Sequence, residues 1–517
     1  MTNQTSPFAV GRHGASPAAL AASATALLLL VAAIAVGQVS RPGFLVIGGM
    51  LVILLAAGAW RWPRVVLLIV VLSPILDRYI LAGLLPSSLG MAARVSSEAL
   101  LAGVALVIAV RGWRDGTLRP ALRHRTVAAL AIFVVVAAVG TLVNAVPPVV
   151  AGAGLAFTVD AAILLVAVRV VGYDLRQAWI SVLAFIALVT VAALVALLQA
   201  LLDPNLFGLY TLQGRFGEVY RLSSFLGDPN TFGAFLVAAI PFALMATVTA
   251  RPRRWRAAAL GLSLLLLVAL WISFSRGAWL AFLVGGGIAS LLIDRRVLVI
   301  GATLAALAFA IALLMPRDLL VPPPDPNGGG GDRPDLVDST LGRFGAVGEG
   351  RDLRAQFVIN AIPILLDHPA VGVGPGRYGG AAADIFPTPV YAAYDTDQFF
   401  SNPAQRTVDN FWLHILVEGG VMGTVALVAA VLAAAWPALL AARRTVGPRR
   451  ILLAGIAGAT ATLAVNAVST MTLEGNSVGY LFWFLLGLGT LVLGAREQVP
   501  DPEPSAGEQE AQQAQPG

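Results

Sequence analysis

The chain has 517 residues, of which 58% are hydrophobic and only 12% are charged, and its formal net charge is +6. Soluble domains carry about 25% charged residues, so this composition excludes an ordinary soluble protein and predicts a polytopic membrane protein. Cysteine is absent, which excludes disulfides, thiolate metal sites and a cysteine nucleophile. All 34 basic residues are Arg, which excludes Schiff-base chemistry and a P-loop, because both need Lys. Arg in a membrane protein first sets topology, so the positive charge does not predict a nucleic-acid partner.

Transmembrane helices are predicted along most of the chain, because a spanning helix needs about 20 apolar residues. Candidate windows lie at 18–38, 43–60, 65–85, 95–110, 127–146, 149–168, 177–202, 230–250, 257–273, 277–293, 297–315, 410–441, 451–470 and 477–495. We therefore predict an all-α fold, a bundle of about 12–14 transmembrane helices with one large, partly helical extracytoplasmic loop. The first apolar run is long enough to span, so we expect a retained helix and not a cleaved signal peptide.

The predicted domains follow from these windows. Residues 1–17 form a cytoplasmic tail, and residues 18–315 form a first bundle of about 11 helices. Residues 316–408 form the large external loop, which opens on the Pro/Gly-rich stretch "PPPDPNGGGGDRPD". Residues 409–497 form a second bundle of about three helices. Residues 498–517 are rich in Glu, Gln and Pro, which predicts a disordered tail.

The distribution of Arg predicts the topology. With a cytoplasmic N-terminus and every window spanning, 21 Arg fall in cytoplasmic segments and seven in the long loop. Six fall in short external segments or outer helix ends, namely Arg41, Arg78, Arg94, Arg215, Arg221 and Arg276. Because short cytoplasmic segments are enriched in basic residues, we expect both termini to be cytoplasmic and the large loop to be extracytoplasmic.

The external segment "YTLQGRFGEVYRLSSFLGDPNTFGAF" (210–235) contains two Arg before a helix start. Arg215 and Arg221 either bind a ligand or snorkel and pair with a neighbouring carboxylate. Asp228 and Asn230 precede an apolar run, which predicts that they cap the next helix.

The stretch "SFSRGAWLAF" (273–282) joins two predicted helices with almost no loop. Arg276 is therefore expected at the outer edge of the membrane. Charged residues near the bilayer are candidate functional residues, and Arg276 is a stronger candidate than Arg215.

A helix is predicted within the external loop. In "DLRAQFVINAIPILLDHP", one helical face carries Leu353, Phe357, Ala361 and Ile364. We expect this helix to lie against the outer membrane surface. The following "GVGPG" (372–376) is a tight turn whose backbone N–H groups either face an anion or simply end the helix.

Three polar residues stand directly before the next membrane helix, in "QRTVDNFWLHILVEGG" (405–420). Asp409 is a candidate general base, and near a membrane surface its pKa would rise towards a useful value unless Arg406 holds the carboxyl group ionised. Asn410 would orient a substrate. The alternative is that Asp409 caps the helix that begins at Phe411.

The ligand chemistry that fits several external Arg is a phosphate group. The guanidinium fork donates two parallel hydrogen bonds and keeps its charge when partly desolvated, so converging Arg fit a lipid-linked diphosphate. The chain's four His show no ligand spacing. A metal held by Asp395, Asp397 and Asp409 is the less favoured interpretation, so we expect neither a metal nor another cofactor.

Four stretches together resemble the O-antigen ligase / O-antigen polymerase superfamily of bacterial membrane glycosyltransferases. They are "RLSSFLGDPNTFGAF" (221–235), "SFSRGAWLAF" (273–282), "LRAQFVINAIPILLDHPAVGVGPGRY" (353–378) and "VDNFWLHILVEGGVMG" (408–423). The resemblance implies packed transmembrane helices with a helical external loop, in a bacterial inner or plasma membrane. It also implies an inverting, metal-independent transfer of glycan from a polyprenyl-diphosphate carrier to a glycan or glycolipid acceptor.

The resemblance assigns roles to the matching positions. It implies that Arg221 and Arg276 hold the diphosphate, that Arg354 helps to bind donor or acceptor, and that Asn410 shapes the site. Arg215 and Arg406 are further expected substrate-binding residues. Two positions depart from the family: Asp409 stands where ligases usually have His, and Val358 stands where an aromatic residue is common. The first departure weakens ligation to a lipopolysaccharide core and leaves a polymerase or another acceptor open.

Two other classes compete with this enzyme. A transporter or flippase for a lipid-linked or anionic substrate should carry charges near the bilayer midplane, whereas here they gather at the outer face. A cell-wall polymerase of the shape, elongation and division type shares the helix-rich architecture but lacks the Arg-"DPN" and His-Pro-Gly stretches.

Overall fold

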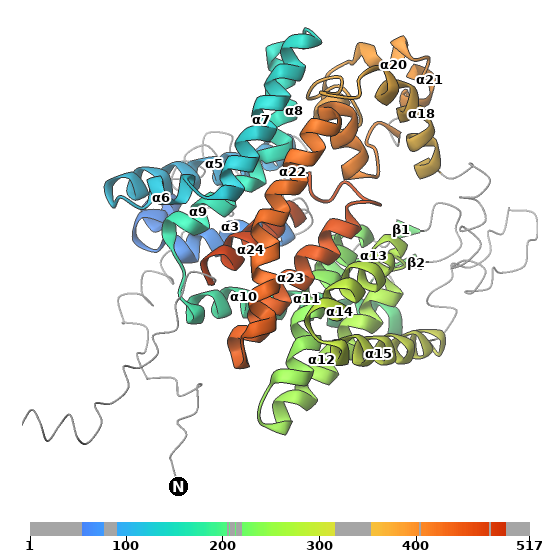
Figure 1. Ribbon diagram of the computed structural model, residues 1–517. Coiled ribbons are helices and arrows are strands. Elements are labelled where there is room, and N and C mark those ends of the chain that lie inside the picture. Colours follow the sequence, from blue (N-terminus) through green and yellow to red (C-terminus); the bar gives the residue numbers. More distant parts are fainter. Residues whose placement is uncertain are drawn as a thin grey trace, which may run out of the picture.

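The structure is a computed structural model of the chain. It describes residues 54–76, 90–203, 206, 212–213, 220–315, 353–402, 405–474 and 477–492 (Figure 1). The predicted tails at both ends, the window 18–38, most of the window 43–60 and the first part of the external loop, 316–352, lie outside these residues.

Helices make up nearly all of the described structure, which confirms the predicted all-α fold. The short strands β1 (Leu212–Gln213) and β2 (Tyr220–Arg221) pair antiparallel, with Leu212 opposite Arg221. In chain order the helices are α3 (Pro63–Leu76), α5 (Gly90–Arg114), α6 (Leu118–Leu122), α7 (Arg125–Val143), α8 (Pro148–Val159), η3 (Asp160–Ala162), α9 (Ile163–Val171), α10 (Leu175–Leu201), η5 (Ser224–Leu226), α11 (Pro229–Thr249), α12 (Arg253–Ile272), α13 (Arg276–Ala281), η6 (Phe282–Gly286), α14 (Gly287–Ile293), α15 (Arg295–Leu313), α18 (Leu353–Asp367), α19 (Ala381–Ile385), α20 (Pro389–Ala393), α21 (Asp397–Phe400), α22 (Phe411–Arg444), α23 (Gly447–Asn466) and α24 (Val478–Val492).

Eight helical spans among the described residues are long and apolar enough to cross a membrane. They are Arg125–Val143, Pro148–Val171, Leu175–Leu201, Pro229–Thr249, Arg253–Ile272, Arg276–Ile293, Arg295–Leu313 and Phe411–Arg444. The helices α3 and α24 are shorter apolar helices. Every predicted window from 95–110 onwards coincides with a helix, so the apolar runs located the helices well.

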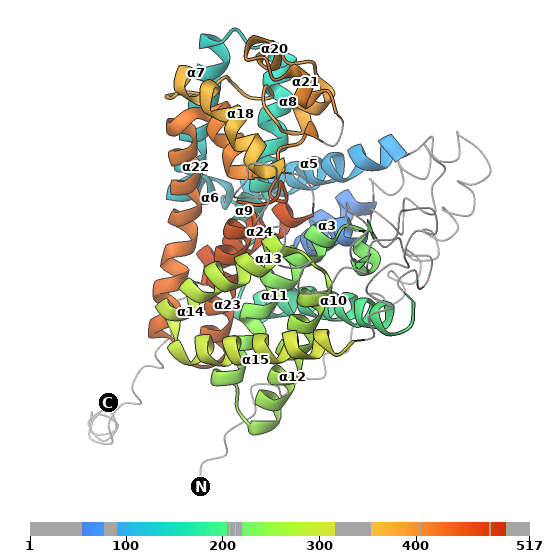
Figure 2. The same cartoon turned by 90° about the vertical axis from the view of Figure 1, so that its right-hand side faces the viewer.

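The helix α11 lies at the centre of the bundle, since 83% of its apolar window is buried. It packs against α23 on one side and α12 on another. The long helix α22 runs beside α7 to the segment that carries α18 to α21 (Figures 1 and 2). The helix α15 crosses the α11–α12 pair steeply in both views.

Small residues allow α11 and α23 to pack closely. A Cβ atom at Gly455 would collide with the Phe242 ring, so glycine is needed there. Pro241 lies inside α11 and has no N–H to donate to the carbonyl of Val237, four residues earlier. The Thr462 hydroxyl of α23 lies 2.9 Å from that carbonyl oxygen. A neighbouring helix therefore satisfies the backbone group that proline leaves without its usual partner.

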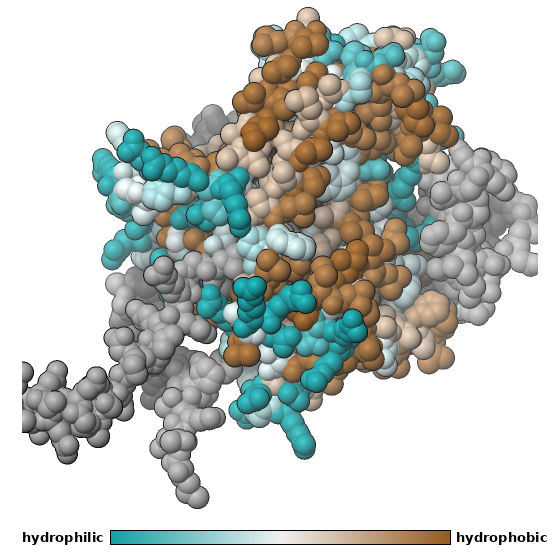
Figure 3. Space-filling model, in the orientation of Figure 1, coloured by the Kyte–Doolittle hydropathy of each residue, from teal (hydrophilic) through white to brown (hydrophobic). Residues whose placement is uncertain are grey.

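The surface in Figure 3 matches a membrane protein. Hydrophobic residues cover most of the visible face over α7, α22 and the α11–α15 region. Hydrophilic residues gather at the segment that carries α18 to α21 and at the opposite helix ends. An apolar band between two polar ends is the pattern expected for helices that span a bilayer.

Candidate active site

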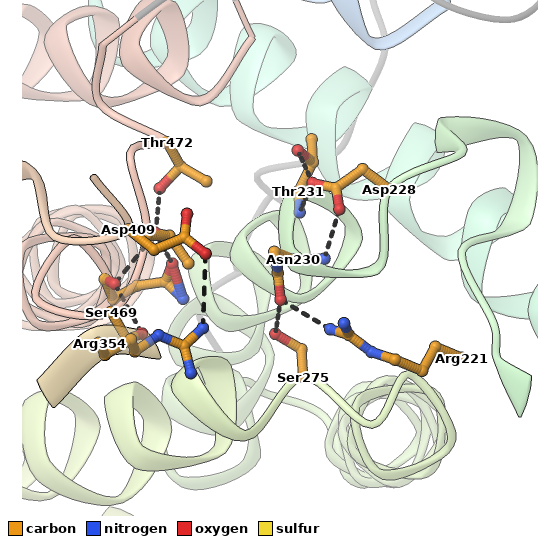
Figure 4. Close-up of polar contacts among 11 residues, drawn as sticks. Arg221, Asp228, Asn230, Thr231, Ser275, Arg354, Asp409, Ser469 and Thr472 are labelled. Atoms are coloured by element: carbon orange, nitrogen blue, oxygen red, sulfur yellow. Dashed lines mark hydrogen bonds and ion pairs between the residues drawn. The ribbon is translucent and has the colours of Figure 1, made fainter. Parts of the chain in front are cut away.

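The first polar cluster joins β2, the start of α11 and the turn before α13. Asn230 Oδ1 accepts hydrogen bonds from Arg221 Nη2 at 2.8 Å and from Ser275 Oγ at 3.2 Å (Figure 4). The Asp228 carboxylate accepts from the backbone N–H groups of Asn230 and Thr231, at 3.3 and 2.8 Å. The predicted cap at Asp228 is therefore confirmed. The predicted capping role of Asn230 is wrong, because its side chain holds Arg221 instead.

Arg276 is the first residue of α13 and is half-buried. A Cβ atom at Gly233 would lie 3.0 Å from both side-chain atoms of Ser275, so glycine lets the first turns of α11 and α13 approach. Gly277 is in similar contact with the side chain of Ser469, where a Cβ atom would collide. The start of α13 is thus wedged between α11 and the turn that follows α23.

The turn after α23 also supports the start of α22. The backbone N–H of Phe411 donates to the carbonyl oxygens of Ala467 and Thr470, at 2.9 and 3.2 Å. The Thr470 hydroxyl lies 2.9 Å from that of Thr472. Because Ser469 belongs to the same turn, the first turns of α13 and α22 flank one short segment. Arg276 and the residues before Phe411 are therefore brought to the same region.

Asp409 lies beside Arg354 of the loop helix α18. Arg354 Nη2 is 3.9 Å from Asp409 Oδ2, and the two side chains are 41% and 43% exposed (Figure 4). The helix cap is made by Asn410, whose Oδ1 accepts from the Leu413 N–H at 3.1 Å. The alternative that Asp409 caps α22 is therefore wrong, and capping does not account for this carboxylate.

Arg406 pairs with a different carboxylate. Its Nη1 is 3.6 Å from Asp384 Oδ1, and the side chains are 42% and 49% exposed. The expected partner of Asp409 was Arg406, but the cation beside Asp409 in the structure is Arg354. The sequence favoured Arg406 because it is close in the chain, whereas the partner comes from another helix.

The glycine-rich turn 372–376 does hold an anion, and the anion belongs to the protein. The backbone N–H groups of Gly376 and Tyr378 donate to the two carboxylate oxygens of Glu418, at 2.9 and 2.8 Å. The Gly374 N–H also donates to the Glu418 carbonyl oxygen at 3.0 Å. These N–H groups are therefore occupied by α22, and the turn is more than a helix stop.

A buried histidine lies next to this carboxylate. His414 Nδ1 is 2.6 Å from the carbonyl oxygen of Tyr378, and its Nε2 is 3.8 Å from Glu418 Oε2. Since a carbonyl oxygen can only accept, Nδ1 carries the proton. Glu474 Oε1 accepts from the Ala381 N–H at 3.1 Å. These contacts tie the loop to α22 and to the segment before α24.

The predicted helix over residues 353–367 is confirmed as α18, with Phe357, Ala361 and Ile364 buried. This face packs into the loop's own core, where the Tyr378 hydroxyl donates to the Phe357 carbonyl oxygen at 3.1 Å. Burial raises the pKa of the Tyr378 phenol, so it remains a donor. The apolar side chains on the other face, led by Leu366 at 74%, are exposed. The expected contact of α18 with the membrane surface stays a prediction.

The structure brings most of the predicted site residues into one region. Arg276, Arg354 and Asp409 lie at or beside helix starts around the turn after α23, and Arg221 of β2 joins them through Asn230. Arg215 lies outside the described residues. Within the described part of the chain, no group of three or more His, Asp or Glu residues could hold a metal ion.

Sequence reasoning missed several residues of this region. Asn230 and Ser469 contact Arg221 and α13 respectively, and Glu418 holds the glycine-rich turn. The one available signal was a carboxylate placed among apolar residues in "ILVEGG", since a buried charge needs partners. The hydroxyl-rich stretch "STMT" (469–472) gave no comparable signal.

Residues 261–428 match the family model described as O-Antigen ligase. The matched range contains Arg276, Arg354, Asp409 and Glu418. This match confirms, over that part of the chain, the resemblance to the O-antigen ligase and polymerase family. No curated protein matches the chain.

Proposed function

We propose that this multi-pass membrane protein, which is similar to O-antigen ligases and polymerases, transfers glycan from a polyprenyl-diphosphate carrier at the extracytoplasmic face. The observation that supports this reaction most is the convergence of two arginines with an Arg–Asp pair. Arg221 of β2 is bonded to Asn230 at the start of α11, Arg276 begins α13, and Arg354 and Asp409 lie across the turn after α23.

The arginines match the leaving group. A carrier diphosphate bears negative charge that grows as the glycosidic bond to it breaks, and fixed guanidinium groups stabilise that charge. Arg221 is held in place by Asn230, so little reorganisation is needed when the diphosphate binds. The side chains of Arg221 and Arg276 therefore contribute to binding the donor and to breaking its bond to the diphosphate.

Asp409 supplies the base in this proposal. The hydroxyl oxygen of the acceptor attacks the anomeric carbon, the bond from that carbon to the diphosphate oxygen breaks, and the hydroxyl proton passes to the carboxylate. The diphosphate leaves with the bonding electron pair, and the configuration inverts. The carboxylate of Asp409 is the group that would accept this proton, and Arg354 Nη2 lies 3.9 Å from its Oδ2.

The proposed topology places the site outside the cytoplasm. Both termini would be cytoplasmic and residues 316–408 external, because Arg is concentrated in the opposite segments. Reporter fusions after Asp335 and after Glu497 should report opposite sides of the membrane. Activity of both reporters on the same side would contradict this arrangement.

The reaction is tested with purified protein in nanodiscs, a polyprenyl-diphosphate-linked glycan and a glycan acceptor. We expect free polyprenyl diphosphate and an extended or modified acceptor to appear together. An Arg276→Ala variant of equal thermal stability should form neither. If the wild-type protein instead carries the intact donor across proteoliposome membranes without cleavage, it is a transporter and the proposed reaction is wrong.

A further inference from the structure

The proposed reaction leaves one buried charged group without a role. Glu418 lies in α22 and is 5% exposed, yet both of its carboxylate oxygens are used, by the N–H groups of Gly376 and Tyr378. Hydrogen bonds to a carboxylate are about twice as strong as neutral ones. Glu418 is therefore a firm attachment point for the glycine-rich turn.

The turn held by Glu418 continues to both members of the Arg354–Asp409 pair. On one side, the Gly379 carbonyl oxygen accepts from the Val408 N–H at 2.8 Å, directly before Asp409. On the other side, the Tyr378 hydroxyl donates to the Phe357 carbonyl oxygen at 3.1 Å. Phe357 lies three residues after Arg354, close to the start of α18.

The Arg354–Asp409 pair itself is too weak to fix these positions. Its closest atoms are 3.9 Å apart and both side chains are about two-fifths exposed. Ion pairs of that kind contribute between about 0 and 1 kcal/mol. This pair therefore adds little to holding the two side chains in place, and the backbone contacts with Gly379 and Tyr378 contribute to their relative position.

We infer that Glu418 is a positioning residue of the proposed reaction. It sets the distance between Arg354 and Asp409 by holding residues 376–379, at the end of the glycine-rich turn. The inference rests on the proposed function for its catalytic consequence, but its geometric content stands alone. The carboxylate of Glu418, on α22, thus holds the part of the site that contains Arg354 and Asp409.

The geometry is measured without any assay of transfer. The chain has no cysteine, so Val358→Cys on α18 and Val425→Cys on α22 place two spin labels at exposed positions. In a Glu418→Gln background, the amide directs an N–H group at a backbone N–H donor and loses one hydrogen bond. We expect the distance distribution between the labels to shift and broaden.

The catalytic consequence is read in the same full-length variant, without labels. A displacement of about 1 Å can lower a rate by about 10²-fold, so kcat should fall by that order. The KM for the donor should stay close to the wild-type value, because Arg221 and Arg276 lie on other elements. A purely structural role would lower the amount of folded protein and leave kcat per folded molecule unchanged.

Two further variants keep the test decisive. Asp367→Asn alters an exposed loop carboxylate that accepts from the Tyr394 hydroxyl at 2.9 Å, and should change neither readout. Tyr378→Phe removes only the contact with the Phe357 carbonyl, and should displace α18 even if Glu418→Gln does not fold.

Unchanged distances in the folded variants would overturn the inference. A shifted distance in a protein whose wild type transfers no glycan would support the positioning and refute only the proposed reaction.

Discussion

The two halves of the candidate site are held in different ways. In the membrane half, Arg221 donates to Asn230 at 2.8 Å, and Ser275, which is fully buried, completes the cluster. In the loop half, Arg354 and Asp409 are 3.9 Å apart and substantially exposed. The membrane half is therefore built before any ligand arrives, whereas the loop half depends on its scaffold.

This difference fits a division of labour. In the proposed reaction the diphosphate is the same in every polyprenyl-linked donor, so an arginine that Asn230 holds in place suits it. Acceptor glycans vary, and a more exposed pair on a loop tolerates variation, as functional loops on rigid scaffolds often do.

Transfer should depend on both the charge and the planar shape of the guanidinium groups in the membrane half. We expect Arg221→Ala and Arg276→Ala to abolish transfer, and the Lys variants to recover little of it, because Lys lacks the planar fork. Transfer from a purified polyprenyl-diphosphate glycan is measured, with thermal stability in parallel. Arg119→Ala, at an exposed position, should remain fully active. Full activity of either Lys variant would reduce that arginine to a topological role.

Removing the proposed base should slow the reaction without unfolding the protein. We expect Asp409→Asn to lower turnover by roughly 10²–10⁴-fold, the usual range for acid–base help. Asp409→His should retain part of the activity if the position accepts a proton. Asp115→Asn, which changes an exposed carboxylate outside the proposed site, is the matched control and should leave turnover unchanged. A fully active Asp409→Asn would exclude the base and leave the arginines as the catalytic groups.

Loosening the membrane half should have an intermediate effect. Asn230→Ala removes the acceptor that orients Arg221, and about 10²-fold lower turnover is expected from the misplaced guanidinium group. The charge of Arg221 remains, so the effect should be smaller than that of Arg221→Ala. Equal losses in the two variants would show that Asn230 does more than orient the arginine.

The exposed Arg406–Asp384 pair should matter least. Asp384→Asn leaves one neutral partner in a pair that is nearly half exposed, and such pairs contribute less than about 1 kcal/mol. Thermal unfolding and turnover should both stay close to the wild-type values. A loss of turnover comparable with that of Asp409→Asn would move Asp384 into the catalytic region.

Local signals in the sequence predicted the helices and part of the site. The face of α18 and the cap at Asp228 follow from residues within one or two helical turns, and both are confirmed. The partners of Asp409 and Glu418 did not follow, because they lie on distant segments. A single sequence shows which charges stand at a membrane edge, but not which of them meet. The steep crossing of α15 was equally unreadable, since apolar composition does not encode helix direction.

The turn after α23 has a consequence for how the protein is made. It lies between the starts of α13 and α22, yet the ribosome completes it after both of them. During synthesis, Arg276 and Asp409 are made before the segment that lies between the starts of their helices. A nascent chain that stops before Gly447 therefore carries the four charged residues of the candidate site but lacks the turn that contacts both helix starts. Arrival of the last hairpin, α23 and α24, is the event that turns an inserted chain into a complete site.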